Sequence, residues 1–338
     1  MPRRSITDSN DAIDLLSITR DAVQRLRTAV ASAVVGQQQV VEFMLITLFA
    51  RGHALLVGVP GLAKTLLVSS IAKALDLRFG RIQFTPDLLP ADITGTDVLH
   101  EDLDENGRAY RHLRFLPGPV FANLVLADEV NRTPPKTQAA LLQAMQERNV
   151  TVGNTTHPLP DPFQVFATRN PIEHEGTYVL PEAQLDRFLL EIHFDYPNED
   201  DEREIASKTT SGHSPSIVPV LHGDDVRQIG ALVPRIPVTE EAVNLAVAVA
   251  RSTRPECDRA TRIVKDYIRF GAGPRGSQAL VLCAKARAAI RGEAAADVED
   301  VRAMIVPAIR HRLVLSYRAE ADGVRDSDVL KEVARAVA

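Results

Sequence analysis

The sequence predicts an α/β protein, in which a parallel sheet with helices on both faces precedes a smaller all-α domain. Short apolar runs alternate with helical or loop segments through the first half of the chain, as buried parallel strands do. A glycine-rich turn follows the first of these runs and opens a helix. After residue 197 the hydrophobic pattern is helical throughout. We therefore expect two domains, at residues 1–196 and 197–338.

The composition fits a soluble two-domain protein. The chain has 338 residues, of which 45% are hydrophobic and 25% charged, and its net charge is −5. An acidic balance gives no bulk support for nucleic-acid binding. The two cysteines, Cys257 and Cys283, lack metal-binding or redox spacing. A polar N-terminal segment and the lack of a bilayer-length apolar run predict a cytoplasmic protein without membrane insertion.

The individual elements follow from periodicity and turn residues. In the first half we expect helices at 11–32, 37–50 and 64–75 and strands at 53–57, 81–85, 123–127 and 164–168. Two polar stretches, 95–119 and 149–162, resemble hairpins or loop insertions. In the second half we expect a charged helix from residue 198 and helices at 223–233, 239–253, 276–291, 298–313 and 325–336.

The glycine-rich turn is the most specific motif. It has the spacing of a phosphate loop and lies between a strand and a helix, the context that such a loop requires. Its backbone N–H groups and the helix N-terminus favour a polyphosphate. We expect the nucleotide to contact Gly58, Val59, Pro60, Gly61, Leu62, Ala63, Lys64, Thr65 and Leu66. Ala63 occupies a position where glycine is usual, and its methyl group is tolerable if the local φ is negative.

Two adjacent carboxylates end a later apolar strand. Leu124 to Ala127 leads into Asp128 and Glu129. Because ligands bind at the carboxyl ends of parallel strands, we expect this pair opposite the phosphate loop, at the tip of a neighbouring strand. Asp128 would hold Mg²⁺ together with the hydroxyl of Thr65, and Glu129 would polarise the attacking water. The alternative is that the two acids cap a helix N-terminus.

Three further polar residues are suited to contact the γ-phosphate. Asn170 ends the strand at 164–168, although an Asn before a Pro can simply form a turn. Arg187 follows a short predicted helix and could supply positive charge from a neighbouring subunit, or pair with Asp186 or a surface acid. Arg275 opens a helix, where the dipole disfavours a cation, so either an anionic partner or a structural salt bridge would explain it.

In combination these motifs resemble the MoxR family of AAA+ ATPases, in the branch with an insert at helix 2. The resemblance spans nearly the whole chain and includes the segments 58–65, 83–95, 124–132, 167–171, 180–188 and 271–275. It implies the P-loop NTPase fold with an all-α lid, and ATP and Mg²⁺ as cofactors. It also implies that Asn170 is sensor 1, Arg187 the arginine finger and Arg275 sensor 2. Val35 and Gly36 would lie against the adenine.

The resemblance further implies a homo-oligomer, in this family a hexameric ring. ATP would bind between the two domains of a subunit, at a site that faces the next subunit. Family members are thought to remodel partner proteins as chaperones, often partners with a von Willebrand factor A domain. Two alternatives remain, a chelatase-type motor subunit and a nucleic-acid motor. The segment 95–119 mixes acids with Arg108, Arg111 and Arg114, and 149–162 contains no Lys or Arg, which weighs against a pore that tracks nucleic acid.

Overall fold

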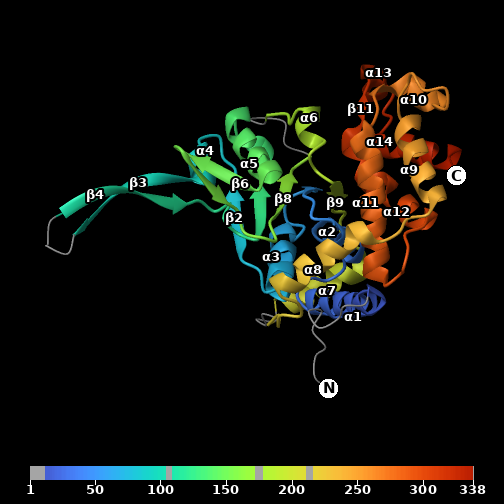
Figure 1. Cartoon of the computed structure of the whole chain (residues 1–338). Helices are drawn as coiled ribbons and strands as arrows, with labels where there is room; N and C mark the ends of the chain where they lie inside the picture. The colour runs from blue at the N-terminus through green and yellow to red at the C-terminus, as the bar shows by residue number, and fades with distance from the viewer. Residues whose placement is uncertain (1–11, 104–108, 172–177, 211–215, 338) are drawn as a thin grey trace.

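The computed structural model describes residues 12–103, 109–171, 178–210 and 216–337. Figure 1 shows an α/β body with a helical lid on one side and a long two-stranded arm that projects from the other side. None of the helices within these ranges combines the length and the apolar character needed to cross a bilayer.

A five-stranded parallel sheet forms the centre of the body. Its strands are β1 (Ala54–Val57), β2 (Phe79–Gln83), β5 (Leu124–Asp128), β8 (Gln164–Arg169) and β9 (Leu190–His193). Their order is β2-β5-β8-β1-β9, and every pairing is parallel. The parallel sheet is confirmed, but the expectation that the loop strand and the acidic strand are neighbours was wrong. β8 lies between β1 and β5, and β9 was not predicted.

Helices cover both faces of the sheet because alternate strand residues point to opposite sides. Leu56 and Leu124 belong to one apolar cluster, with side chains of α1 (Ala12–Ala31), α2 (Gln38–Phe49) and α3 (Lys64–Ala74). Leu55 and Val125 belong to a second cluster, which includes side chains of α4 (Pro90–Thr94) and α5 (Pro135–Glu147). The three central strands β1, β5 and β8 are therefore buried on both faces, which explains why they are mostly apolar.

Both predicted hairpins are present. The projecting arm consists of β3 (Gly95–Leu103) and β4 (Ala109–Pro117), and a shorter hairpin consists of β6 (Asn149–Val152) and β7 (Thr155–Pro158). The base of the arm packs on the shorter hairpin, since the rings of Phe115 and His157 stack with their centroids 3.8 Å apart.

The second half of the chain is helical and confirms the predicted lid. Its helices are α7 (Glu199–Thr209), α8 (Gly223–Leu232), η3 (Val233–Arg235), α9 (Glu240–Ser252), α10 (Arg262–Tyr267), α11 (Pro274–Arg291), α12 (Val298–Ile309), η4 (Arg310–Arg312), α13 (Tyr317–Ala321) and α14 (Asp326–Ala336). Two short antiparallel strands, β10 (Ile268–Phe270) and β11 (Val314–Leu315), lie among them. Because α8 packs on α2 of the body, the boundary at residues 196 and 197 stays a prediction.

Candidate nucleotide-binding and hydrolysis site

The phosphate loop links β1 to α3 as the sequence predicted. Gly61 adopts φ +89°, a backbone conformation that favours glycine, and its Cβ position is open. The Lys64 ammonium donates hydrogen bonds to the carbonyl oxygens of Gly58 and Val59, the latter at 3.1 Å. The loop backbone and the N-terminus of the eleven-residue helix α3 together provide the donors that a polyphosphate needs.

Ala63 does not meet the condition set for it. Its φ is +57°, whereas its methyl group would be tolerable at a negative φ. The backbone of Ala63 is therefore held in the left-handed conformation, which costs an L-residue about 1–2 kcal/mol. Its backbone remains in place as the N-cap of α3. Local strain of this kind is found at functional sites.

One cavity of about 410 Å³ brings together three of the predicted catalytic residues, Lys64, Glu129 and Asn170. It is lined by Pro60, Gly61, Leu62, Ala63, Lys64, Thr65, Leu66, Asp128, Glu129, Thr168 and Asn170. Partial burial lowers the pKa of Lys64, and the carboxylates of Asp128 and Glu129 oppose that shift. The arrangement thus places a cation, two acids and an amide side chain around one space.

The two carboxylates are oriented by different partners. The Asp128 carboxylate accepts hydrogen bonds from Arg81 Nη2 at 2.7 Å and from the Thr168 hydroxyl at 2.7 Å. Glu129 accepts one from Gln83 Nε2 at 2.9 Å and has a left-handed backbone, with φ 60°. Glu129 precedes the short 3₁₀ helix η2 (Val130–Arg132), but its side chain makes no capping hydrogen bond. The structure therefore does not favour the alternative that the acids serve as a helix cap.

Thr168 was not predicted as a site residue. It is buried at the end of β8, between the loop strand and the acidic strand. Its hydroxyl donates to Asp128 and accepts from the backbone N–H of Glu129 at 2.7 Å. One hydroxyl thus fixes both acidic residues, a role visible only once the strand order is known.

The donor set at the cavity fits a hard divalent cation. Thr65 and Asp128 both line the cavity and offer a hydroxyl and a carboxylate oxygen, the ligands that Mg²⁺ prefers beside substrate phosphates. The acid that would bind the cation is already aligned by Arg81 and Thr168.

A second cavity of about 390 Å³ adjoins the loop and includes the predicted adenine contacts. It contains Val35 and Gly36, and it shares loop residues with the first cavity. Gly36 has φ +69°, which favours glycine, and a Cβ there would lie 2.7 Å from Asp201 Oδ2, so a larger residue would be strained and would displace that side chain. Sequence reasoning missed the opposite wall, which includes Tyr196, Asp201 and Ile205.

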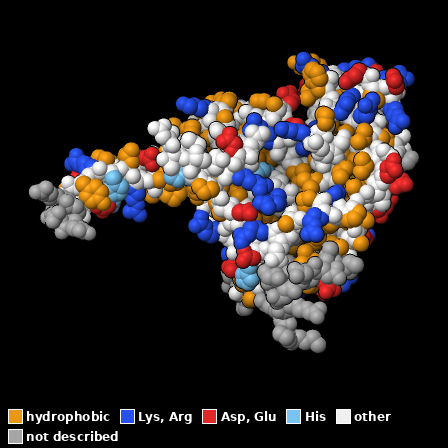
Figure 2. All heavy atoms as spheres, in the orientation of Figure 1, with side chains coloured by type: hydrophobic (Ala, Val, Ile, Leu, Met, Phe, Trp, Pro, Cys, Tyr) orange, Lys and Arg blue, Asp and Glu red, His pale blue; other side chains and the backbone are white. Residues whose placement is uncertain are grey.

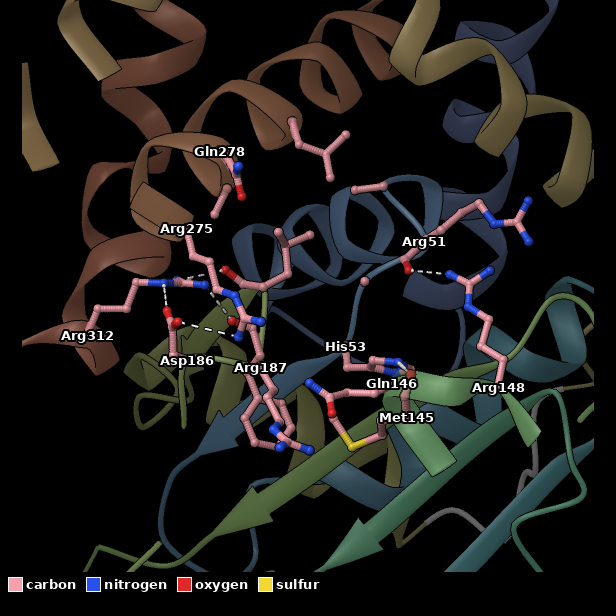
Figure 3. A pocket seen from close by; sticks show the side chains of 16 residues that line it. Arg51, His53, Met145, Gln146, Arg148, Asp186, Arg187, Arg275, Gln278 and Arg312 are labelled. Atoms are coloured by element: carbon pink, nitrogen blue, oxygen red, sulfur yellow. Dashed lines mark hydrogen bonds and ion pairs between the residues drawn. The ribbon is translucent and has the colours of Figure 1, made fainter. Parts of the chain in front are cut away.

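The predicted arginines lie elsewhere. Arg187 and Arg275 line a third cavity of about 360 Å³, together with Arg51, Arg148 and Arg312 (Figure 3). In Figure 2, basic side chains gather on the face between the body and the lid. The cavity also contains residues 52–53 and 186–189, which immediately precede β1 and β9. It therefore lies at the amino ends of the strands, whereas the phosphate loop follows the carboxyl end of β1.

The expected position of Arg275 therefore needs correction. We expected ATP between the two domains of a subunit, with Arg275 acting on it from the lid. Residues of α7 do line the adenine cavity, but no residue of α11 lines either nucleotide cavity. Instead Arg275 Nη1 lies 3.5 Å from Asp186 Oδ2. Arg187 donates from Nη1 to the Leu142 carbonyl oxygen at 3.4 Å.

A phosphate loop on β1, an acidic pair on β5, a polar strand end between them and a helical lid define a P-loop ATPase of the AAA type. Residues 53–190 match the family described as "ATPase family associated with various cellular activities (AAA)", and residues 260–333 match the AAA lid domain. The chain belongs to the MoxR family of AAA+ ATPases, as its relatives show.

Three comparisons define that similarity. The chain is 42% identical to Chaperone MoxR1 of Mycobacterium tuberculosis over 94% of this chain and 82% of that protein. It is 32% identical to Protein MoxR of Methylorubrum extorquens over 96% and 95% of the two chains. A candidate ATPase from Cytophaga hutchinsonii with a solved structure aligns with a TM-score of 0.87 and 38% identity, covering 96% of each chain.

Proposed function

We propose that copies of this chain form a ring, hexameric as in the family resemblance, in which Arg187 and Arg275 complete the ATP site of the adjacent copy. The observation that carries the proposal is the separation of the two half-sites. The loop follows the carboxyl end of β1, and the arginine cavity precedes its amino end. Four strand residues span about 13 Å, so the sheet itself lies between the arginines and the phosphates bound by the same chain.

Each half-site supplies part of the hydrolysis of ATP. Lys64 and the loop amides bind the β- and γ-phosphates, while Glu129 orients and polarises the attacking water. Asn170, which follows β8 and lines the same cavity, contacts the γ-phosphate or that water in this proposal. Mg²⁺ held by Thr65 and Asp128 would neutralise phosphate charge. The neighbouring arginines stabilise the negative charge that develops as the γ-phosphate leaves.

Mixed assemblies test the shared site. Glu129→Gln removes the water-polarising acid but keeps the arginine face, whereas Arg187→Ala removes the finger but keeps the loop site. Each variant alone is expected to be nearly inactive. An equal random mixture should recover about a quarter of the wild-type turnover per chain, since half the chains keep Glu129 and half of those meet an intact face. Absence of recovery, with assembly intact, would contradict the proposal.

We also propose that the ring remodels partner proteins, as a chaperone does, and that these partners carry a von Willebrand factor A domain. The arm supports a protein client over a nucleic acid. Leu99 and Leu113 lie directly opposite each other and are 64% and 67% exposed. Figure 2 shows apolar side chains along the arm. Exposed apolar surface of this kind marks a protein contact.

The proposed location is the cytoplasm, because the free thiols of Cys257 and Cys283 would persist in that reducing compartment.

Trapping the ATP-bound protein on its client tests this second proposal. Glu129→Gln loaded with ATP should retain a client with a von Willebrand factor A domain in a pull-down read by mass spectrometry. Leu99→Ser with Leu113→Ser should lose that client, whereas Val247→Ser, at a 40% exposed position on α9, should keep it. Recovery of nucleic acid would instead support the motor alternative, and recovery of a metal-chelatase partner the chelatase alternative.

A further inference from the structure

The segment that carries the arginine finger is bonded to the lid. Arg312, the last residue of η4, is only 4% exposed, and Figure 3 shows it beside Asp186. Its Nε donates to Asp186 Oδ1 at 2.8 Å. Its Nη2 donates to the Phe188 carbonyl oxygen at 2.8 Å, and Nη1 lies 3.3 Å from that of Leu189. One lid guanidinium therefore bonds residues on both sides of Arg187.

A second lid residue lies against the same segment. The Nε2 atom of His311, which precedes Arg312, lies 3.0 Å from the Phe188 carbonyl oxygen. Burial, with the adjacent Arg312 charge, lowers the pKa of His311 to about 3, so its ring is neutral at physiological pH. The Phe188 side chain, by contrast, is fully buried in the apolar cluster of the body. Residue 188 is thus fixed to the body by its ring and to the lid by its carbonyl group.

Arg187 and Arg275 are both linked to the contact between Arg312 and Asp186. Arg187 follows Asp186 in the chain, and Arg275 pairs with the other carboxylate oxygen of Asp186. Arg312 itself is too deeply buried to reach a phosphate on another copy. Its influence on the reaction must therefore pass through Asp186 and the backbone of 188–189.

We propose that Arg312 is a positioning residue that couples the lid to the finger segment, so that lid movement changes how Arg187 and Arg275 meet the adjacent copy. This inference rests on the proposed shared site. The lid is also in contact with the nucleotide side of the body, since α11 packs on α2, whose start lies at the adenine cavity. The nucleotide state of one copy thereby biases the arginines that it presents to the next copy.

Mixed assemblies with Arg312→Gln test this role. The variant keeps its own loop site, so its affinity for a fluorescent ATP analogue should stay within about twofold of wild type. Its turnover alone should fall at least about tenfold, because both arginines lose their support. An equal mixture with Glu129→Gln should recover about a quarter of wild-type turnover, since Glu129→Gln chains supply an intact face. A merely structural role would lower binding and would not be rescued.

A matched control lies two residues away. Arg310 is also a buried lid arginine, 14% exposed, but it pairs at 3.5 Å with Asp326 inside the lid. Arg310→Gln should therefore keep wild-type turnover. If Arg312→Gln does not fold, Asp186→Asn removes the shared charge at a more exposed position and should give the same rescue.

The outcomes separate this inference from the proposed function. If Arg187→Ala is rescued by Glu129→Gln but neither Arg312→Gln nor Asp186→Asn is, the shared site stands and the coupling is overturned. If Arg187→Ala is not rescued, the shared site itself fails. Equal losses of turnover in Arg310→Gln and Arg312→Gln would also overturn the coupling, because any lid damage would then suffice.

Discussion

The carboxyl ends and the amino ends of the sheet strands carry complementary groups for ATP hydrolysis. The loop cavity at the carboxyl ends contains a lysine, two acids and an amide. The cavity at the amino ends is lined by five arginines and one acid, Asp186. The first can bind a nucleotide and direct water to it, but it lacks the guanidinium groups that favour phosphoryl transfer. The second has those groups without any phosphate loop. In the proposed shared site, the groups that bind the nucleotide and activate water therefore lie on one face, and the arginines that complete the site lie on the other.

The largest effects on nucleotide affinity and turnover should come from mutating one residue of each face separately. Lys64→Ala should abolish detectable nucleotide binding, because the loop loses the cation that neutralises the phosphates. Arg187→Ala should keep binding and lower turnover by about 10³-fold, the range of an arginine finger. Nucleotide affinity by fluorescence and turnover by phosphate release distinguish the two. A loss of affinity in Arg187→Ala comparable to that in Lys64→Ala would break the comparison.

A smaller effect is expected inside the loop cavity. Thr168→Val removes the hydroxyl that orients Asp128 and accepts from Glu129 N–H. An unsatisfied buried donor costs about 1–3 kcal/mol, and the same loss of support for the acids in the transition state lowers turnover about 5- to 160-fold. Thr168→Ser keeps the hydroxyl and should remain within about threefold of wild type. Equal rates for the Val and Ser variants would show that the hydroxyl does not align the acids.

A histidine in the arginine cavity should also make the stability of the fold sensitive to acid. His53 lines that cavity. Its Nδ1 accepts a hydrogen bond from the Val165 N–H, and its Nε2 donates one to the Met145 carbonyl oxygen. Protonation would oppose the first bond, and burial lowers the pKa of His53 to about 4. A His with a lowered folded-state pKa stabilises the fold fully above pH 6.5, and that stability is lost as the pH falls towards 4.

At pH 5.5 the loss should be about 1.4 kcal/mol for His53, one pH unit below the unfolded pKa. Urea unfolding at pH 7.5 and 5.5 measures it. His53→Gln can donate and accept without titrating, so its pH dependence should be weaker. His222, exposed beside Asp76, is the control, and His222→Gln should leave the acid sensitivity of wild type. An unchanged pH dependence in His53→Gln would contradict this assignment.

The smallest effect concerns the strained loop residue. Ala63→Gly relieves a left-handed alanine, a gain of about 1–2 kcal/mol, partly offset by the flexibility of glycine in the unfolded chain, about 0.5–1 kcal/mol. Thermal unfolding should show a net stabilisation of about 1 kcal/mol or less, with nucleotide affinity equal or a few-fold higher. A weaker affinity would show that the methyl group contributes to the loop.

Local patterns predicted the parts of the site that lie close together in sequence. The loop from Gly58 to Thr65, the acids at 128 and 129 and both hairpins could be recognised because backbone periodicity and turn chemistry determine them. The sequence did not reveal Thr168 or Arg81 as partners of Asp128. Their roles depend on the order β2-β5-β8, which is set by tertiary packing.

The sequence left one backbone angle and one domain placement undetermined. Ala63 has a positive φ because the surrounding loop holds it there, which propensity alone does not show. Arg275 was assigned to the nucleotide of its own chain, since the motif says nothing of which edge of the sheet α11 faces. Arg312 had no signal, because its partners lie 123 to 126 residues away.

The most direct measurement is the specific ATPase activity of the wild-type protein as a function of its own concentration, with assembly followed in parallel by light scattering. A site shared between copies predicts that turnover per chain rises with concentration and that its midpoint coincides with that of assembly. Full turnover by dilute single chains would contradict the account, because the arginines would then act within one chain.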